Sequence, residues 1–373
     1  MTKNIGGIEM FQKNIVDCID REKFEIEFAS ASPDAALIPY LEEKGIKTHI
    51  IPPHKKIFAY CRAMYRLIKS EKYDIVHIHK NSCIDPFDFI ICRLAGVKKI
   101  VAHSHSTAPI NLKKLSFIHY IFRPLIRNIS TDMAACSPDA ARWLFGKKAY
   151  ESGKVTVISN GIDTRRFRFD PEVRLRVRKE YGLDGELVFG HVGNFVTAKN
   201  HFFLVEIFDE IVKIHPRSTL MLVGSGELAE KVRKYAKKLG IEEKIMFMGT
   251  RHDVNELMQG MDMFLLPSLY EGFPISGVEA QTAGLPCLFS DAITRDILLT
   301  PKARQMPLSS SAEKWAGTAV SAAKEPSRAD NSQMIIDAGY GIYTAAAEID
   351  KIYSGKTTEE KGNEINERQP DFT

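Results

Sequence analysis

The sequence has no long apolar run, no paired-cysteine motif and little excess charge of either sign. Nowhere do the roughly 20 apolar residues that a membrane-spanning helix needs follow one another, and no signal peptide opens the chain. The six cysteines are scattered without a CxxC pair or a zinc-like spacing, which argues for free thiols in a reducing compartment. The net charge of +4 gives no support to a nucleic-acid partner. We therefore expect a cytoplasmic protein that does not bind nucleic acid.

At 373 residues the chain is too long for one compact core, and its pattern predicts an α/β protein of two domains. Short apolar runs alternate with longer amphipathic stretches, which favours parallel sheets covered by helices on both faces. The runs that we predict to be strands are residues 24–30, 47–52, 74–79, 99–105, 132–137, 155–159, 187–193, 218–224, 244–249, 263–268 and 286–290. We expect two Rossmann-like domains, joined near residues 160–185 and facing across a cleft, with ligands beyond the carboxyl ends of the strands.

Two glutamates stand eight residues apart in the stretch PSLYEGFPISGVEAQTAGLP, residues 267–286. Pro274 suits a first helical turn, so a helix is predicted to begin near Pro274–Ser276, with Glu271 in the preceding loop and Glu279 one to two turns in. The two carboxylates are then about 8–12 Å apart at the rise of a helix. This exceeds the roughly 5–5.5 Å of a retaining glycosidase pair and suits the two ends of an extended ligand. The alternative is that Glu271 caps the helix and Glu279 is solvated.

The E-x7-E spacing in this setting resembles the signature of family 4, a large family of retaining glycosyltransferases with the GT-B fold. Other segments resemble the family's motifs in their proper order: GGIEMFQKNI, VAHSHS, VISNGID, HVGNFVTAKNH, LMLVGSGE and FMGTRHDV. The resemblance covers residues 5 to about 355 and is closest to bacterial enzymes of exopolysaccharide and capsule synthesis. It implies an acceptor-side domain (1–165), a nucleotide-sugar domain (166–330) and a helix crossing back to the first domain (331–355). The polar composition of residues 356–373 predicts a disordered tail.

By this resemblance, the two glutamates bind different parts of a nucleoside-diphosphate sugar. Glu279 accepts hydrogen bonds from the ribose hydroxyls, and Glu271 contacts hydroxyls of the transferred sugar near the reacting carbon. Ionised carboxylates suit this role because they only accept and can each take two hydroxyl donors. The backbone at Gly272, Phe273, Pro274 and Ile275 lines the sugar and diphosphate. No cofactor is implied beyond this substrate, and a uridine nucleotide is favoured by association with the family.

The resemblance also assigns the loop after the first strand of the second domain. Lys199 is placed to neutralise the diphosphate as the nucleotide leaves, although a lysine before a helix is commonly only a surface residue. Asn194 stands where the family usually has an arginine, which removes a bidentate phosphate partner. Because asparagine still donates neutral hydrogen bonds, we expect weaker donor binding or slower turnover.

Four histidines form two HxH pairs, His77/His79 and His103/His105, each at the end of a predicted strand. They invite a metal hypothesis, but i and i+2 share a face only while the strand continues. No acidic ligand is evident beside them and no DxD motif occurs, so we expect no metal. The resemblance instead marks His105 as a catalytic candidate near the transferred sugar and acceptor, and leaves the other three as structural residues.

The opening residues resemble the family's glycine loop without the strand that precedes it. Gly6 and Gly7 let the backbone approach the diphosphate and acceptor closely. The family has an apolar first strand before this loop, whereas this sequence has only MTKNI. We expect the first strand of the N-terminal domain to be missing, which exposes two strand edges; either translation starts upstream or the protein is a truncated, impaired member.

Two basic stretches with aromatic residues, 54–73 and 112–127, lie in the first domain. Leu115, Ile118, Phe122, Leu125 and Ile126 of the second fall on one stripe, which is either a core-facing stripe with a solvated basic face or part of a surface for anionic lipid. Both interpretations can hold together, with the protein peripheral on the inner face of the cell membrane.

These features predict a retaining, metal-independent glycosyltransferase acting on a hydroxyl of a saccharide, expected to be lipid-linked, in exopolysaccharide or capsule synthesis. The first alternative is a non-catalytic nucleotide-sugar-binding relative or partner subunit, motivated by the missing strand and Asn194. A metal-dependent hydrolase built on the histidines and a glucan phosphorylase of the same fold are further alternatives.

Overall fold

The computed structural model describes residues 7–106, 116–324 and 328–355, and these divide into two compact units. Unit 1 comprises the described residues up to Asn160 and those from Ile342 onward, and unit 2 comprises Gly161–Gly341. The first boundary between the units lies five residues before the predicted 165/166 boundary. The second lies eleven residues after the predicted 330/331 boundary. A physical reason is that Ile162 pairs with Gly341 in a parallel bridge, so the two chain crossings run side by side.

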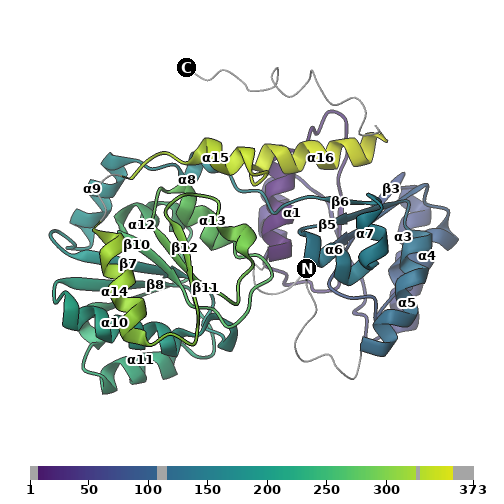
Figure 1. Ribbon diagram of the computed structural model, residues 1–373. Coiled ribbons are helices and arrows are strands. Elements are labelled where there is room, and N and C mark those ends of the chain that lie inside the picture. The colour runs from purple at the N-terminus through teal and green to yellow at the C-terminus, as the bar shows by residue number, and fades with distance from the viewer. Residues whose placement is uncertain (1–6, 107–115, 325–327, 356–373) are drawn as a thin grey trace. The chain divides into compact units, whose positions relative to one another are not determined.

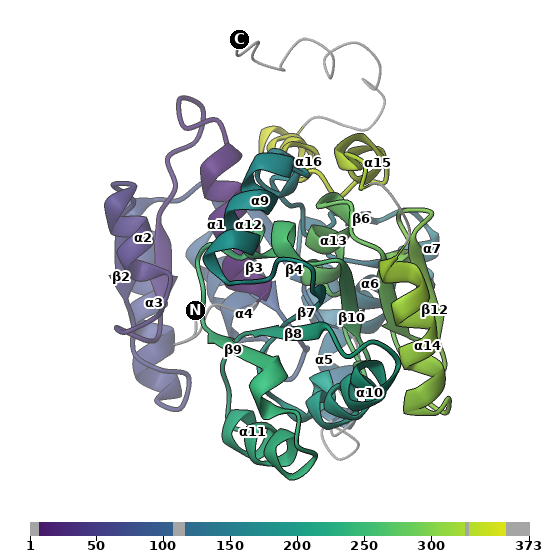
Figure 2. The same ribbon diagram turned by 90° about the vertical axis from the view of Figure 1, so that its left-hand side faces the viewer.

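Unit 2 contains a six-stranded parallel sheet in the spatial order β12-β11-β10-β7-β8-β9. Numbered along the chain, this is the order 3-2-1-4-5-6 of a Rossmann sheet, and Figure 2 shows β9, β8, β7 and β10 following one another across it. The strands are β7 (Leu187–Val192), β8 (Ser218–Val223), β9 (Ile245–Gly249), β10 (Met263–Leu266), β11 (Cys287–Ser290) and β12 (Ala303–Met306).

Helices cover both faces of this sheet (Figure 1). Helices α10 (His201–Ile214), α11 (Ala229–Lys238) and α14 (Ala312–Ala323) pack on one face, where Trp315 is fully buried. The other face carries α8 (Thr164–Phe167), α12 (Val254–Gly260), α13 (Ile275–Thr282) and α15 (Ser332–Asp337). The remaining helical elements are α9 (Pro171–Glu180) and the short 3-10 turns η1 (Thr197–Lys199), η2 (Glu242–Lys244) and η3 (Arg295–Ile297). Strands β10 and β11 are buried along their whole length, as expected of strands covered on both faces.

Unit 1 contains a four-stranded parallel sheet, β3-β4-β5-β6, and a separate two-stranded parallel sheet, β1-β2. The strands are β1 (Phe28–Ser30), β2 (Thr48–Ile50), β3 (Ile75–Lys80), β4 (Lys99–Ser104), β5 (Asp132–Ala135) and β6 (Val155–Val157). In a Rossmann sheet the strand preceding the first helix lies between the strands that correspond here to β1 and β3. Among the described residues no strand occupies that place, so β1 and β3 each have an edge without a paired strand.

The helices of unit 1 also form two layers. On one face of the four-stranded sheet lie α3 (Ile57–Glu71), α4 (Phe87–Ala95), α5 (Ser116–Ile129), α6 (Pro138–Phe145) and α7 (Lys147–Glu151). The other face is covered by α1 (Gly7–Cys18) and α16 (Ile342–Ser354), while α2 (Ile38–Glu43) packs near β1. Where the sequence predicts one crossing helix over 331–355, the structure has α15 and α16, separated at Gly339, whose φ of +84° ends the helical path.

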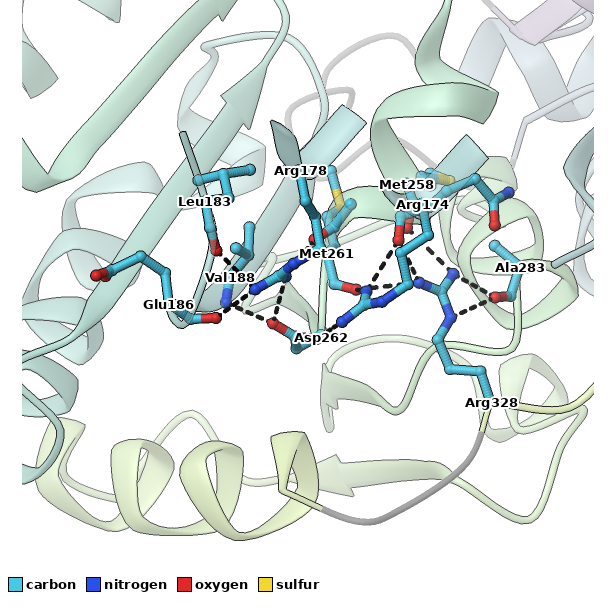
Figure 3. A network of polar contacts seen from close by, with 12 residues as sticks. Arg174, Arg178, Leu183, Glu186, Val188, Met258, Met261, Asp262, Ala283 and Arg328 are labelled. Atoms are coloured by element: carbon cyan, nitrogen blue, oxygen red, sulfur yellow. Dashed lines mark hydrogen bonds and ion pairs between the residues drawn. The ribbon is translucent and has the colours of Figure 1, made fainter. Parts of the chain in front are cut away.

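A network of three arginines joins α9 and the segment at Arg328 to the residues around the ends of α12 and α13 (Figure 3). Asp262, just before β10, accepts from Arg174 and Arg178 of α9 and from the amide of Val188 in β7. Arg328 donates to four backbone carbonyls at the ends of α12 and α13, those of Met258, Gln259, Met261 and Ala283. These hydrogen bonds satisfy carbonyls that helix ends leave without partners.

No helix in the described part of the chain is both long enough and apolar enough to cross a bilayer.

Candidate functional site

Lys199 and Glu271 form an ion pair at the point where the strand order of unit 2 reverses. Their Nζ and Oε1 atoms are 2.6 Å apart, and Glu271 Oε1 also accepts from Ser268 Oγ at 2.7 Å. Lys199 follows β7 and Glu271 follows β10, and these two strands are neighbours on either side of the switch point. Ligands of such sheets bind outside the carboxyl ends of the strands at this place. The structure therefore joins two residues that the sequence nominated separately, at the position expected for a ligand.

The loop that carries Lys199 is held by close backbone contacts. A Cβ on Gly193 would lie 3.0 Å from Lys199 Cε, so the lysine stem passes directly over this glycine. Gly224, with φ +141°, approaches so closely that an added Cβ would lie 2.1 Å from the Gly193 carbonyl oxygen. The amide of Phe195 also donates to the Ser225 carbonyl. These close contacts hold the loop in place and thereby position the Lys199 side chain beside Glu271.

Helix α13 begins at Ile275 with Pro274 at its N-cap, which confirms the predicted helix start. Glu271 lies in the loop before it and contacts Lys199 and Ser268, so it does not act as the helix cap. Among the donor-loop residues, Gly272 is exposed, Pro274 is buried, and Phe273 stacks on Tyr340 with ring centroids 4.7 Å apart. Ile275 packs against the apolar core of unit 2.

Glu279 lies just beyond the first turn of α13, in a different electrostatic setting. Burial raises the pKa of its carboxyl to about 7, and the positive charge of Arg166 acts in the opposite direction. Arg166 belongs to α8, which packs against α13. Its guanidinium also donates to the His252 carbonyl at 2.7 Å and to Asn255 Oδ1 at 3.2 Å.

A cavity of about 560 Å³ lies beside Arg166 and the residues that follow β9. Its lining comprises Arg166, Thr250, Arg251, His252, Asp253, Asn255 and Glu256. This segment contains the family-like TRHDV, but sequence reasoning assigned no role to Arg166. The only indication of Arg166 in the sequence was its position shortly after the VISNGID segment. That position does not reveal that α8 packs against α13.

Asn194 is exposed in the loop after β7, on the carboxyl side of that strand. No hydrogen bond of its side chain is seen among the described residues, so its amide is available to a ligand there.

The remaining predicted site residues belong to unit 1. His105 follows β4, and its Nε2 is 2.8 Å from Nδ1 of His79. Burial lowers the pKa of His105 well below its usual range, with a further lowering from His79. Gly7 is the first residue of α1 and is exposed. A Cβ added to Gly7 would just reach van der Waals contact with Asn160. Gly6 and the tail 356–373 lie outside the described residues, as do Leu115 and the lysines of 112–115.

Two family models match consecutive parts of the chain. The model described as Glycosyltransferase Family 4 matches residues 5–166, and the model described as Glycosyl transferases group 1 matches residues 173–296. A putative glycosyltransferase EpsF of Bacillus subtilis is 31% identical over 370 residues, covering 95% of this chain and 94% of that protein. A UDP-Gal:alpha-D-GlcNAc-diphosphoundecaprenol alpha-1,3-galactosyltransferase of Escherichia coli is 28% identical and covers 77% of this chain and 76% of that enzyme.

Solved structures match the fold over nearly the whole chain. Anabaena Alr3699/HepE in complex with UDP has a TM-score of 0.76 at 19% identity, covering 95% of this chain and 98% of that one. Its complex with UDP-glucose has a TM-score of 0.72 at 18% identity, with the same coverage. At these identities the likeness shows the fold, two Rossmann-like units.

Proposed function

Because the chain belongs to the GT-B glycosyltransferases, we propose that it transfers a sugar, with retention of anomeric configuration, from a nucleoside-diphosphate sugar to a saccharide hydroxyl in exopolysaccharide or capsule synthesis. The observation that carries this proposal is the Lys199–Glu271 pair at the switch point of unit 2. It offers a cation for the diphosphate directly beside an acceptor for sugar hydroxyls.

Lys199 supplies positive charge where the leaving nucleotide gains negative charge. As the bond from the anomeric carbon to the phosphate oxygen breaks, the acceptor oxygen bonds to that carbon on the same face. The acceptor's hydroxyl proton passes to the departing phosphate oxygen. Glu271 accepts from hydroxyls of the transferred sugar and fixes its position relative to Lys199. These steps need only the chain's own residues, so we propose transfer without a metal.

The nucleotide end of the donor is assigned to Glu279 and the cavity beside it. Glu279 accepts from the ribose hydroxyls, and the 560 Å³ cavity at Arg166 and the residues after β9 receives the base. Uridine is favoured, since the Escherichia coli relative is named for UDP-Gal and the Anabaena structures contain UDP and UDP-glucose. Backbone at Gly272, Phe273, Pro274 and Ile275, with Asn194 and the Gly6–Gly7 loop, completes the donor site.

The acceptor is proposed to be lipid-linked and to meet unit 1, where His105 orients it. The Escherichia coli relative is named for a diphosphoundecaprenol acceptor. On α5, Phe117, Tyr120 and Ile121 are 71%, 53% and 52% exposed at helical spacing, next to Arg123 and Arg127. Of the predicted stripe, Ile126 is fully buried and Phe122 packs beside it, whereas Ile118 and Leu125 are only partly buried. The opposite, exposed apolar face suits peripheral contact with the inner face of the cell membrane.

The transferase proposal is tested by incubating purified protein and membrane extract with a panel of radiolabelled nucleotide sugars in EDTA. We expect transfer of label from one donor to an extractable acceptor, and no transfer by Glu271→Gln. Binding of a donor without transfer under every condition would favour the non-catalytic alternative. Loss of activity in EDTA would contradict metal independence, and phosphate-dependent release of sugar phosphate would indicate a phosphorylase.

Membrane contact is tested separately with vesicles of neutral and anionic lipid. We expect the protein to float with anionic vesicles, and a Phe117→Ser/Ile121→Ser variant to lose most of this binding. A Leu175→Ser variant, which removes a 72% exposed leucine from α9 of unit 2, controls for general loss of surface hydrophobicity. Equal loss in both variants would contradict a specific role for α5.

A further inference from the structure

Four imidazoles gather on the face of β3 and β4 that α1 and α16 cover. Strand β3 continues to Lys80, so His77 and His79 share one face, and His79 is in register with His103 of β4. One of the three sequence arguments against a metal, beside the missing acidic ligand and the missing DxD motif, was that the residues of an HxH pair share a face only while the strand continues. The ordered strands remove that premise and bring the rings together.

The ring nitrogens of this cluster are spaced for a common ligand. One nitrogen each from His77, His79 and His103 lies within 4.8 Å of the other two. His77 Nε2 and His103 Nδ1 are 3.1 Å apart. Two nitrogens bound to one tetrahedral zinc at about 2.0–2.1 Å are separated by about 3.3 Å, so this pair needs little movement to share an ion.

An apolar cover lies over this cluster, and one of its ring nitrogens has no partner in the described part of the chain. His103 is fully buried, and its Nε2 has no hydrogen-bond partner among the described residues. Phe11 of α1 packs edge-on against His103 at 4.9 Å between centroids. Leaving a buried ring nitrogen without a partner under an apolar cover is costly.

We propose that His77, His79 and His103 bind a single divalent transition-metal ion of the zinc class. Three neutral imidazoles suit Zn²⁺, Co²⁺, Ni²⁺ or Cu²⁺ and disfavour Mg²⁺, Ca²⁺ and Mn²⁺, which prefer oxygen ligands. His77 and His79 are only partly buried, which gives an ion a path of entry. The site lies in unit 1 next to His105, and the readouts that test it do not use a nucleotide sugar.

Neighbouring residues orient the proposed ligands. His77 Nδ1 is 2.7 Å from the hydroxyl of Tyr353 on α16, which turns Nε2 toward His103. His79 Nδ1 contacts His105, so Nε2 is its ring nitrogen for the metal. Such outer partners fix the tautomer of a ligating histidine. Tyr353 is therefore a positioning residue, and metal binding ties α16 to β3.

The test uses the full chain with a tag lacking histidine, stripped with EDTA and dialysed. Titration with Co²⁺ is followed by visible absorption, and Zn²⁺ affinity by competition with a chromophoric chelator. We expect one saturable equivalent, the strong visible bands of four-coordinate Co²⁺, displacement by Zn²⁺, and a higher melting temperature when loaded. His77→Gln is expected to weaken binding at least 100-fold, and Tyr353→Phe by about 10–100-fold.

The matched control is His54→Gln, which removes an exposed histidine of unit 1 that pairs with Asp85 at the surface. It should leave the affinity unchanged. The proposal is overturned if the native protein shows no stoichiometric binding, if Co²⁺ gives only the weak spectrum of an octahedral aquo-ion, or if His54→Gln and His77→Gln act alike. None of these readouts depends on nucleotide sugar, so failure of the transferase proposal is seen separately.

Discussion

Replacing Lys199 and Glu271 one at a time should separate binding of the nucleotide from transfer of the sugar. The two side chains are 17% and 13% exposed, and their charged atoms lie 2.6 Å apart. In the proposed site Lys199 acts on the diphosphate and Glu271 on the sugar. Binding of UDP alone therefore depends on Lys199, whereas binding of a UDP-sugar depends on both residues.

The size of each effect follows from the hydrogen bonds that the substitution removes. A hydrogen bond to a charged group contributes about 1.5–3 kcal/mol, which corresponds to roughly 10–150-fold in affinity or rate. We expect Lys199→Ala to weaken UDP binding by this factor and to reduce transfer at least tenfold. Glu271→Gln removes the group that competes with the diphosphate for Lys199, so UDP should bind at least as tightly as to the native protein, whereas transfer should fall at least tenfold.

The two variants and the native protein are compared by calorimetric titration with UDP, by a transfer assay and by thermal melts. Melts are needed because each substitution leaves a largely buried partner, which can cost about 3–5 kcal/mol of stability. Ser268 still donates to Glu271 when Lys199 is absent, so the folded state should persist. Lys213→Ala, on the exposed side of α10, is the control and should change nothing. Near-normal transfer by both site variants, or an equal loss of UDP affinity in both, would refute the assignment.

Three further predictions follow from unit 2. Asn194→Arg restores a charged phosphate partner and should tighten UDP about tenfold by calorimetry; an unchanged affinity would remove this account of the position. Because burial raises the pKa of Glu279 to about 7, its carboxyl ionises as the pH rises, so UDP-glucose affinity should increase by up to about tenfold from pH 6 to pH 8, and Glu279→Gln should flatten that profile. Arg328→Met leaves several carbonyls at the ends of α12 and α13 unpaired and should lower the free energy of unfolding by about 3–5 kcal/mol in denaturant titrations; a decrease below about 1 kcal/mol would contradict the network's role.

The strands could largely be predicted from sequence because parallel strands buried on both faces leave continuous apolar runs. All eleven predicted runs contain a strand in the structure. The twelfth, β12, was missed because its residues Ala303–Met306 include Arg304 and Gln305. An edge strand pairs on one side only, with β11, and tolerates such polar residues.

Spatial neighbours across the sheet could not be predicted from the residues themselves. Lys199 and Glu271 are 72 residues apart, and they meet only because β10 pairs with β7 and not with β9, the preceding strand. Likewise, the two HxH pairs in the sequence do not indicate the register of β3 against β4. The pairing of His79 with His103 is therefore known only from the structure. Neither Arg328 nor Asp262 stood out in the sequence, because the residues around an arginine that donates to backbone carbonyls do not differ from those around any other loop arginine.

The two glutamates that the sequence singled out occupy electrostatically different places, and this difference gives them different roles. Glu271 already has a cationic partner in Lys199, so its negative charge is compensated before any donor binds. Burial raises the pKa of Glu279, so its ionised form gains from the hydroxyl donors that a ribose supplies. A donor must therefore displace or share an existing ion pair at one end and ionise a carboxyl at the other. In the proposed donor site, we therefore expect recognition of the nucleotide at Glu279 to be the pH-sensitive step, and competition of the diphosphate with Glu271 for Lys199 to couple binding to the position of the sugar.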